Sequence, residues 1–322
     1  MSKQGSLPPL GPAWAGSLMG TSIAATLTSI HGMRALSFVF LGLSAIVLCA
    51  LTVGYARYRN PKFHQPFMAP WGMAVMGLLA FGGAWTTIVG SPVVQEIIWL
   101  LATPVAVAVC INQLRKFHGE PQFMWGLALV PPMVAATSGG QLATSAHLPD
   151  MLATAHWLIA IVCFALTFVT AIPVFARVYI EVLRSKVHIP APLTGTTWIP
   201  LGVVGQSTAA AVVLTNKIEM PHVAIIYGYI MLVLGIPLAS YAAYRFWTAI
   251  ASWPAYSPGW WGSTFPVGTL SLGAHMLATT THQPWLDIIS RIALALLLIH
   301  WFVAALGAIS HLRITPRHIT RR

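Results

Sequence analysis

The chain has 322 residues, of which 57% are hydrophobic and 7% are charged, and its formal net charge is +11. This number of charged residues is too small to cover the surface of a water-soluble protein. The composition therefore excludes a soluble globular protein and predicts an integral membrane protein. The three cysteines all lie in apolar runs, which argues against a disulfide framework and is typical of small buried residues.

Ten apolar segments are long enough to cross a membrane, which takes about 20 mostly apolar residues per helix. In chain order we expect them near residues 12–31, 35–56, 70–90, 94–113, 123–144, 150–177, 196–215, 221–247, 258–280 and 286–310. Because the number of crossings is even, both termini lie on the same side of the membrane. We expect residues 1–322 to form a single transmembrane domain.

The lysine and arginine residues gather on one side of this arrangement. When both termini are placed in the cytoplasm, 14 of the 17 basic residues lie inside, and only Arg34, Lys217 and Arg291 lie outside. Cytoplasmic loops of membrane proteins carry such an excess. The asymmetry predicts a multi-pass protein of the plasma (inner) membrane with cytoplasmic N- and C-termini. The basic charge then reflects topology and contact with membrane lipid, so we expect no nucleic acid partner.

The odd-numbered segments contain many small residues and prolines, whereas the even-numbered segments are richer in bulky aliphatic residues. Small residues allow close approach of helix backbones, and bulky aliphatic side chains suit lipid. This alternation predicts an all-α integral membrane fold of ten transmembrane helices in five helical hairpins, with the odd-numbered helices forming an inner pore ring. The alternative is that the pattern carries no structural meaning, since glycine and proline are frequent in membrane helices. We expect pore-helix breaks at Gly20, Gly83, Pro131, Pro132, Gly202, Gly205, Pro266 and Gly268.

No constellation of catalytic residues is apparent. The sequence has no Walker-type phosphate loop, and its six acidic residues fall near segment ends or in loops. Cation pathways place carboxylates at mid-membrane depth, so their absence there favours a pathway for neutral molecules or anions. Backbone N–H groups at broken helices would supply the positive potential that an anion needs. We therefore expect a transport protein and not an enzyme.

The most informative stretch is SPGWWGSTFPVG at residues 257–268. Trp260 and Trp261 precede an apolar segment, where paired tryptophans are expected to anchor a helix at the membrane interface. Phe265 stands directly before a Pro-x-Gly sequence on a segment rich in small residues. Most membrane phenylalanines serve packing or face lipid, but this setting favours Phe265 as a pore gate, an aromatic plug beside a helix break.

Histidine is the one titratable residue type that gathers at the outer side. His156 and His275 are the candidates for pH sensing, since protonation would make the outer mouth more positive. The alternative is that each is an interfacial residue satisfied by hydrogen bonds. The sequence shows no HExxH motif and no run of Cys and His ligands. We therefore expect no metal site and no cofactor, and a membrane-embedded redox enzyme is disfavoured.

Four stretches resemble signatures of the tellurite-resistance/dicarboxylate transporter family, which includes bacterial tellurite-resistance proteins, plant slow anion channels, and fungal malate and sulfite carriers. The most specific is WWGSTFPVG at 260–268; the others are PAWAGSLMGT at 12–21, PPMVAA at 131–136 and IPLGVVGQS at 199–207. The resemblance covers essentially the whole chain. It implies ten helices in five hairpins, a homotrimer with one pore per subunit, and a phenylalanine on the ninth helix that occludes the pore. That role falls to Phe265.

Two transport functions are compatible with these features. The first is a channel-like pathway for small inorganic or organic anions, gated by the aromatic plug at Phe265. The second is proton-coupled transport of a C4-dicarboxylate such as malate, or of sulfite, and the outer histidines are its support in the sequence. The resemblance does not choose the anion, because members of the family handle several.

Overall fold

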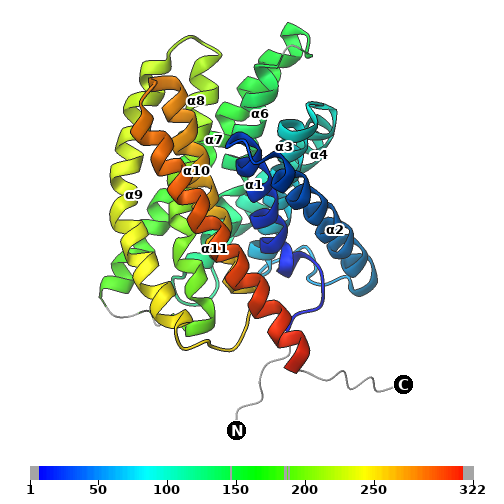
Figure 1. Cartoon of the computed structure of the whole chain (residues 1–322). Helices are drawn as coiled ribbons and strands as arrows, with labels where there is room; N and C mark the ends of the chain where they lie inside the picture. Colours follow the sequence, from blue (N-terminus) through cyan, green and yellow to red (C-terminus); the bar gives the residue numbers. More distant parts are fainter. Residues whose placement is uncertain (1–6, 146, 185–186, 188, 315–322) are drawn as a thin grey trace.

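The computed structural model describes residues 7–145, 147–184, 187 and 189–314, and within them it contains helices and no strands (Figure 1). The α-helices are α1 (Ala15–Ile30), α2 (Arg34–Tyr58), α3 (Met68–Val89), α4 (Val93–Arg115), α5 (Gly126–Leu129), α6 (Pro131–Ala143), α7 (Asp150–Leu183), α8 (Ile199–Asn216), α9 (Pro221–Ile250), α10 (Thr264–Thr281) and α11 (Pro284–Ile314). Four 3₁₀ helices precede inner segments: η1 (Pro12–Trp14), η2 (Phe123–Trp125), η3 (Ala191–Trp198) and η4 (Pro258–Ser263). The predicted all-α fold is confirmed, with η2, α5 and α6 together forming the fifth segment.

The helices form two layers. In the inner layer α1, α3, α6, α8 and α10 contact one another in this order, and α10 contacts α1 again, so they close a ring. Each of α2, α4, α7 and α9 packs against the inner helix that precedes it and also touches the inner helix that follows it, and α11 packs against α10 and touches α1. The prediction of five hairpins with the odd-numbered segments inside is therefore confirmed.

Seven helices of the described chain are long and apolar enough to cross a membrane: α2, α3, α4, α7, α8 with η3, α9 and α11. The other three segments, α1, α5 with α6, and α10, are inner ones that are short or rich in small polar residues. In the span of α8 the whole apolar window is buried, against 22% of the window in α9. Inner segments can be less apolar because protein surrounds them, whereas lipid surrounds the outer ones.

The positions of the helix ends bear on the predicted boundaries and on the predicted orientation in the membrane. α1 begins and α11 ends at the same end of the bundle, the lower end in Figure 1. Among the basic residues that define the orientation, Lys3, Lys186, Arg317, Arg321 and Arg322 lie outside the described residues. Helix α7 continues six residues past the predicted end at 177. Arg184, which follows the helix, forms a partly exposed ion pair with Glu181 at 3.8 Å.

Most of the predicted helix breaks are wrong in position. Helices α1, α3, α8 and α10 run without interruption through Gly20, Gly83, Gly202, Gly205 and Gly268. The changes of helix type occur earlier, where η1, η3 and η4 pass into α1, α8 and α10. In the fifth segment α5 ends before Pro131 and Pro132, which are the first residues of α6.

Prolines at these helix starts remove no hydrogen bond. Pro131, Pro132, Pro200 and Pro266 each lie in the first turn of a helix. The N–H groups of a first turn have no partner within the helix, so a missing N–H costs little there. The prolines therefore mark where the inner α-helices begin.

Glycines mark places where inner helices touch. A side chain at Gly205 of α8 would collide with the backbone of Thr269 and Leu270 in α10. A side chain at Gly273 of α10 would lie 2.5 Å from the carbonyl oxygen of Gly205. Close approach of two backbones, and not a bend in either helix, is the reason for glycine here.

Between α1 and α10, glycines make room for side chains of the neighbouring helix. Gly20 of α1 faces the side chain of Thr264, and a side chain at Gly268 of α10 would lie 2.6 Å from Ile23. These contacts hold α10 against both of its neighbours in the ring, which fixes the position of every residue in its first turns.

The change Gly205→Ala should destabilise the protein by about 1–3 kcal/mol, because the added methyl group must push α8 and α10 apart. The melting temperature of the purified protein in detergent checks this expectation. Gly42→Ala is the matched control, since Gly42 lies on α2 with nothing within 4 Å of an added Cβ. Equal melting temperatures for the two variants would contradict the proposed backbone contact.

Candidate functional site

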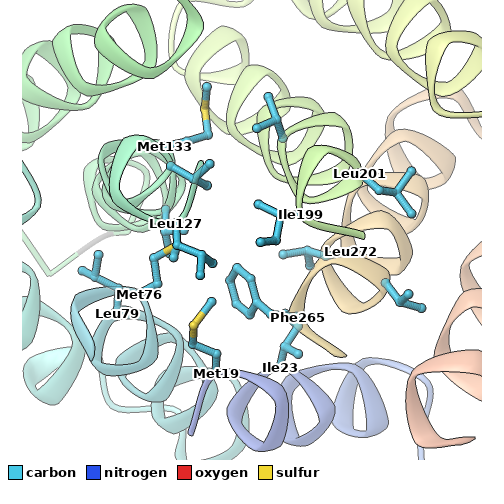
Figure 2. Packing of buried hydrophobic residues seen from close by; sticks show 14 of the residues in the cluster. Met19, Ile23, Met76, Leu79, Leu127, Met133, Ile199, Leu201, Phe265 and Leu272 are labelled. Atoms are coloured by element: carbon cyan, nitrogen blue, oxygen red, sulfur yellow. The ribbon is translucent and has the colours of Figure 1, made fainter. Parts of the chain in front are cut away.

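Phe265 lies at the centre of the inner ring. It is the second residue of α10 and is 4% exposed. Figure 2 shows its ring directed into the space enclosed by the inner helices, with Met19, Met76, Leu127 and Ile199 around it. These four side chains come from α1, α3, α5 and α8. Phe265 therefore has neighbours from four other helices of the inner segments.

Two cavities meet at Phe265, which lines both of them. The smaller, of about 20 Å³, lies toward the N-terminal ends of the inner helices and includes Met19, Met76 and Trp261. The larger, of about 50 Å³, lies toward their C-terminal ends. The phenyl ring therefore separates two spaces on the same axis.

The lining of the larger cavity combines apolar residues with six uncharged polar side chains. They come from α1, α3, α6 and α8 and are Thr26, Thr87, Thr137, Ser138, Gln141 and Gln206. The smaller cavity has almost entirely apolar walls. Neither cavity has a charged residue in its lining.

Hydrogen bonds within this lining leave donors unused. Gln95 of α4 donates from Nε2 to Oγ of Ser138 at 3.0 Å and to Oε1 of Gln141 at 3.1 Å. Gln206 donates one amide hydrogen to Oγ1 of Thr137 at 2.7 Å. Within the described chain, no hydrogen bond uses the hydroxyl hydrogen of Ser138 or the amide hydrogens of Gln141. The cavity thus offers donors without a cationic group, an arrangement that suits a weakly held anion.

A family model described as a voltage-dependent anion channel matches residues 9–309. The chain belongs to this family. The chain is also similar to the sulfite efflux pump SSU1 of Trichophyton rubrum, with 26% identity over 323 residues that cover 86% of this chain and 84% of the relative. For the sulfite efflux pump SSU1 of Arthroderma benhamiae the identity is 25% over 322 residues, with the same coverage.

The family assignment confirms the resemblance found in the sequence. This member of the anion-channel family is a multi-span membrane protein, and both the family description and the names of its relatives are those of channels and transporters. Transport of anions is the function they share.

The structure places the predicted site residues of this anion-channel protein in two groups. Phe265 and Gly83 line the larger cavity, and Phe265, Gly202 and Pro266 line the smaller one. The others, Gly20, Pro131, Pro132, Gly205 and Gly268, belong to helix starts or helix contacts and line neither cavity. Gly83 has nothing within 4 Å of an added Cβ, so it keeps the wall of the larger cavity open.

The tryptophans before Phe265 do not form an exposed interfacial anchor. Trp260 is 1% exposed and Trp261 is 6% exposed. Trp261 donates from Nε1 to the hydroxyl of Tyr256 at 2.9 Å, and its ring packs edge-on against Trp301. The prediction is wrong because η4 turns both indole rings into the protein, where Trp261 forms part of the wall of the smaller cavity.

The two histidines predicted to sense pH lie in different surroundings. His156 of α7 donates from Nδ1 to the carbonyl oxygen of Leu152 at 2.8 Å and stacks on Trp99 at a centroid distance of 4.3 Å. His275 of α10 instead pairs with Asp287 at 3.1 Å. No hydrogen bond or ring contact joins His156 to His275 in the described chain, so the structure does not bring them together as one group.

His275 has a different histidine beside it. The ring of His31, in the turn after α1, lies 5.3 Å from that of His275, centroid to centroid. Burial lowers the pKa of His31 below its usual value, nearby His275 and Arg291 act in the same direction, and Asp287 opposes them. The sequence-based prediction of pH-sensing histidines did not include His31.

The polar lining of the larger cavity also went unnoticed in the sequence. Val134, Thr137, Ser138 and Gln141 all line it and follow one another at i, i+3, i+4 and i+7. This spacing places them on one face of α6. A polar face inside an apolar segment is a signal that could have identified these residues.

Proposed function

We propose that the protein forms a passive, channel-like pathway for small anions along the axis of the inner ring, and that Phe265 closes it. The single observation that carries this proposal is that Phe265 lines both the polar and the apolar cavity. A residue in that position blocks passage with its ring and permits passage when the ring moves aside.

Electrostatics favour an anion over a cation. The cavities have no carboxylate, which a cation pathway would need, and the larger one presents hydroxyl and amide hydrogens. The N-terminal turns of the inner helices add partial positive charge. Without a fixed cation the anion is held weakly, and weak binding allows it to leave quickly.

The size of the larger cavity favours a small inorganic oxyanion. The space of about 50 Å³ has room for a few water molecules, so a small anion enters it with the least movement of the walls. The similar fungal proteins are named sulfite efflux pumps, so we propose sulfite as the first anion to test. Proton-coupled transport of a C4-dicarboxylate is the second candidate, and the separate surroundings of His156 and His275 favour it less.

We extend the proposal to the setting of the protein. The predicted excess of basic residues on one side supports a plasma membrane location with both termini in the cytoplasm. The polar cavity then faces outward and Phe265 lies on its inner side. A homotrimer with one pathway per subunit is the assembly that the family resemblance implies.

Phe265→Ala should raise anion flux into liposomes at least tenfold, since lowering the barrier by about 1.4 kcal/mol suffices for a factor of ten. Stopped-flow or electrode measurements of sulfite and nitrate uptake check the result. Phe246→Ala is the matched control, because Phe246 is 1% exposed on the outer helix α9 and lines neither cavity. If Phe265→Ala is folded and its flux stays at the wild-type level, the ring is not a gate.

In the Phe265→Ala background, Gln206→Leu should lower flux about tenfold, because a hydrogen bond to a charged group contributes about 1.5–3 kcal/mol. The same assay measures this, with Gln113→Leu as control. Gln113 is 4% exposed and bonds the carbonyl of Lys116, away from both cavities. Equal losses for the two glutamines would show that the effect is structural.

Sulfite should pass the opened Phe265→Ala protein at least tenfold faster than malate, because the larger malate ion must displace more of the packed side chains around the cavity. Uptake of radiolabelled sulfite and malate at equal concentrations tests this selectivity. Faster malate uptake that also requires a proton gradient would favour the proton-coupled dicarboxylate transporter instead.

A further inference from the structure

Three side chains with no part in the proposed pathway come together at the end of the bundle opposite the termini. His31 lies in the turn after α1, His275 near the end of α10, and Asp287 in the first turn of α11. One possible ligand atom from each lies within 4.8 Å of the other two, and no other such group of three occurs in the part of the chain that the structure describes.

The two ring nitrogens of His31 have different surroundings. Nε2 lies 2.9 Å from Oγ of Ser290, and that oxygen also lies 2.8 Å from the carbonyl oxygen of Ser271 and 3.0 Å from Oγ of Ser271. Nδ1 has no hydrogen-bond partner, although the His31 side chain is 1% exposed. A buried nitrogen without a partner is costly, so Nδ1 points to a ligand.

Nδ1 of His31 lies near a carboxylate and a second imidazole. Nδ1 of His31 is 3.9 Å from Oδ1 of Asp287, and Nδ1 of His275 is 3.1 Å from the same oxygen. Two ligand atoms of a tetrahedral zinc ion, each bonded at 2.0–2.1 Å, are about 3.3 Å apart. The two observed separations bracket this value, so small side-chain rotations bring all three atoms to bonding distance of one ion.

Arg291 occupies the other oxygen of the carboxylate. Its Nε donates to Oδ2 of Asp287 at 2.8 Å, which fixes the carboxylate with Oδ1 toward the two histidines. The guanidinium charge opposes cation binding, but 59% of its side chain is exposed, so water and salt screen it. Ser290 and Arg291 therefore act as the outer supports that orient ligands in many metal sites.

We propose that His31, His275 and Asp287 bind one divalent transition-metal ion of the zinc class, with water completing the coordination. Two imidazoles and one carboxylate suit zinc, whereas magnesium and calcium prefer oxygen ligands. To bind the ion through Nδ1, His275 gives up its hydrogen bond to Oδ1 of Asp287 and carries its hydrogen on Nε2. The ion links the ends of α1, α10 and α11, and α10 is the helix that carries Phe265.

The test uses the full-length protein in detergent, stripped of metal with a chelator and then dialysed against zinc. Elemental analysis should find one saturably bound zinc per chain. His31→Ala and Asp287→Asn should each lower zinc affinity at least tenfold. Cobalt added instead of zinc should give the visible absorption of a tetrahedral site in the wild type and lose it in both variants.

His147→Ala is the matched control. His147 lies 3.1 Å from Glu96 at the same end of the bundle, a histidine–carboxylate pair without a third ligand. This variant should keep the zinc stoichiometry of the wild type. Wild-type protein that binds no zinc saturably, or His31→Ala that binds it as the wild type does, overturns the proposal. The wild-type measurement decides the matter even if a variant fails to fold.

Discussion

Direct contact between the backbones of α8 and α10 is the constraint on which the rest of the structure depends. Gly205 and Gly273 leave no side chain between these helices, and Gly20 and Gly268 make room for the side chains of Thr264 and Ile23 between α1 and α10. Within a membrane there is little hydrophobic force between helices, so such close packing is what holds them together. The inner helices close a ring in which the first turn of α10 has a fixed position. Phe265, the second residue of α10, therefore lies on the axis of the ring.

The chemistry of the pathway follows from what the ring places on that axis. One side of Phe265 has hydroxyl and amide donors, and the other has sulfur, indole and aliphatic groups. A strongly basic lining would trap an anion, and an entirely apolar one would exclude it. Donors without charge lie between these limits. The metal site proposed at the outer ends of α1, α10 and α11 is separate from this lining. It would affect the ring of inner helices from their outer ends.

Composition and hydrophobic pattern were enough to predict the helices, the hairpins and the two layers, because lipid leaves the backbone few alternatives. Phe265 could be singled out because it directly precedes a Pro-x-Gly sequence on a segment rich in small residues. The glycines were given the wrong role, since a sequence shows where small residues occur and not whether a neighbouring backbone approaches them, as at Gly205. The cluster of His31, His275 and Asp287 could not be predicted at all, because its members belong to three helices whose ends meet only in the folded protein.

The methionines beside Phe265 have a mechanical consequence. Met19, Met73 and Met76 line the smaller cavity, and an unbranched thioether side chain adapts its shape with little strain. Room for a displaced phenyl ring can therefore come from rotations of these side chains while α1 and α3 stay in place. The inner helices are closely packed, whereas the methionine side chains that line the cavity can change rotamer. The proposed opening therefore proceeds by side-chain rotation and needs no sliding of helices.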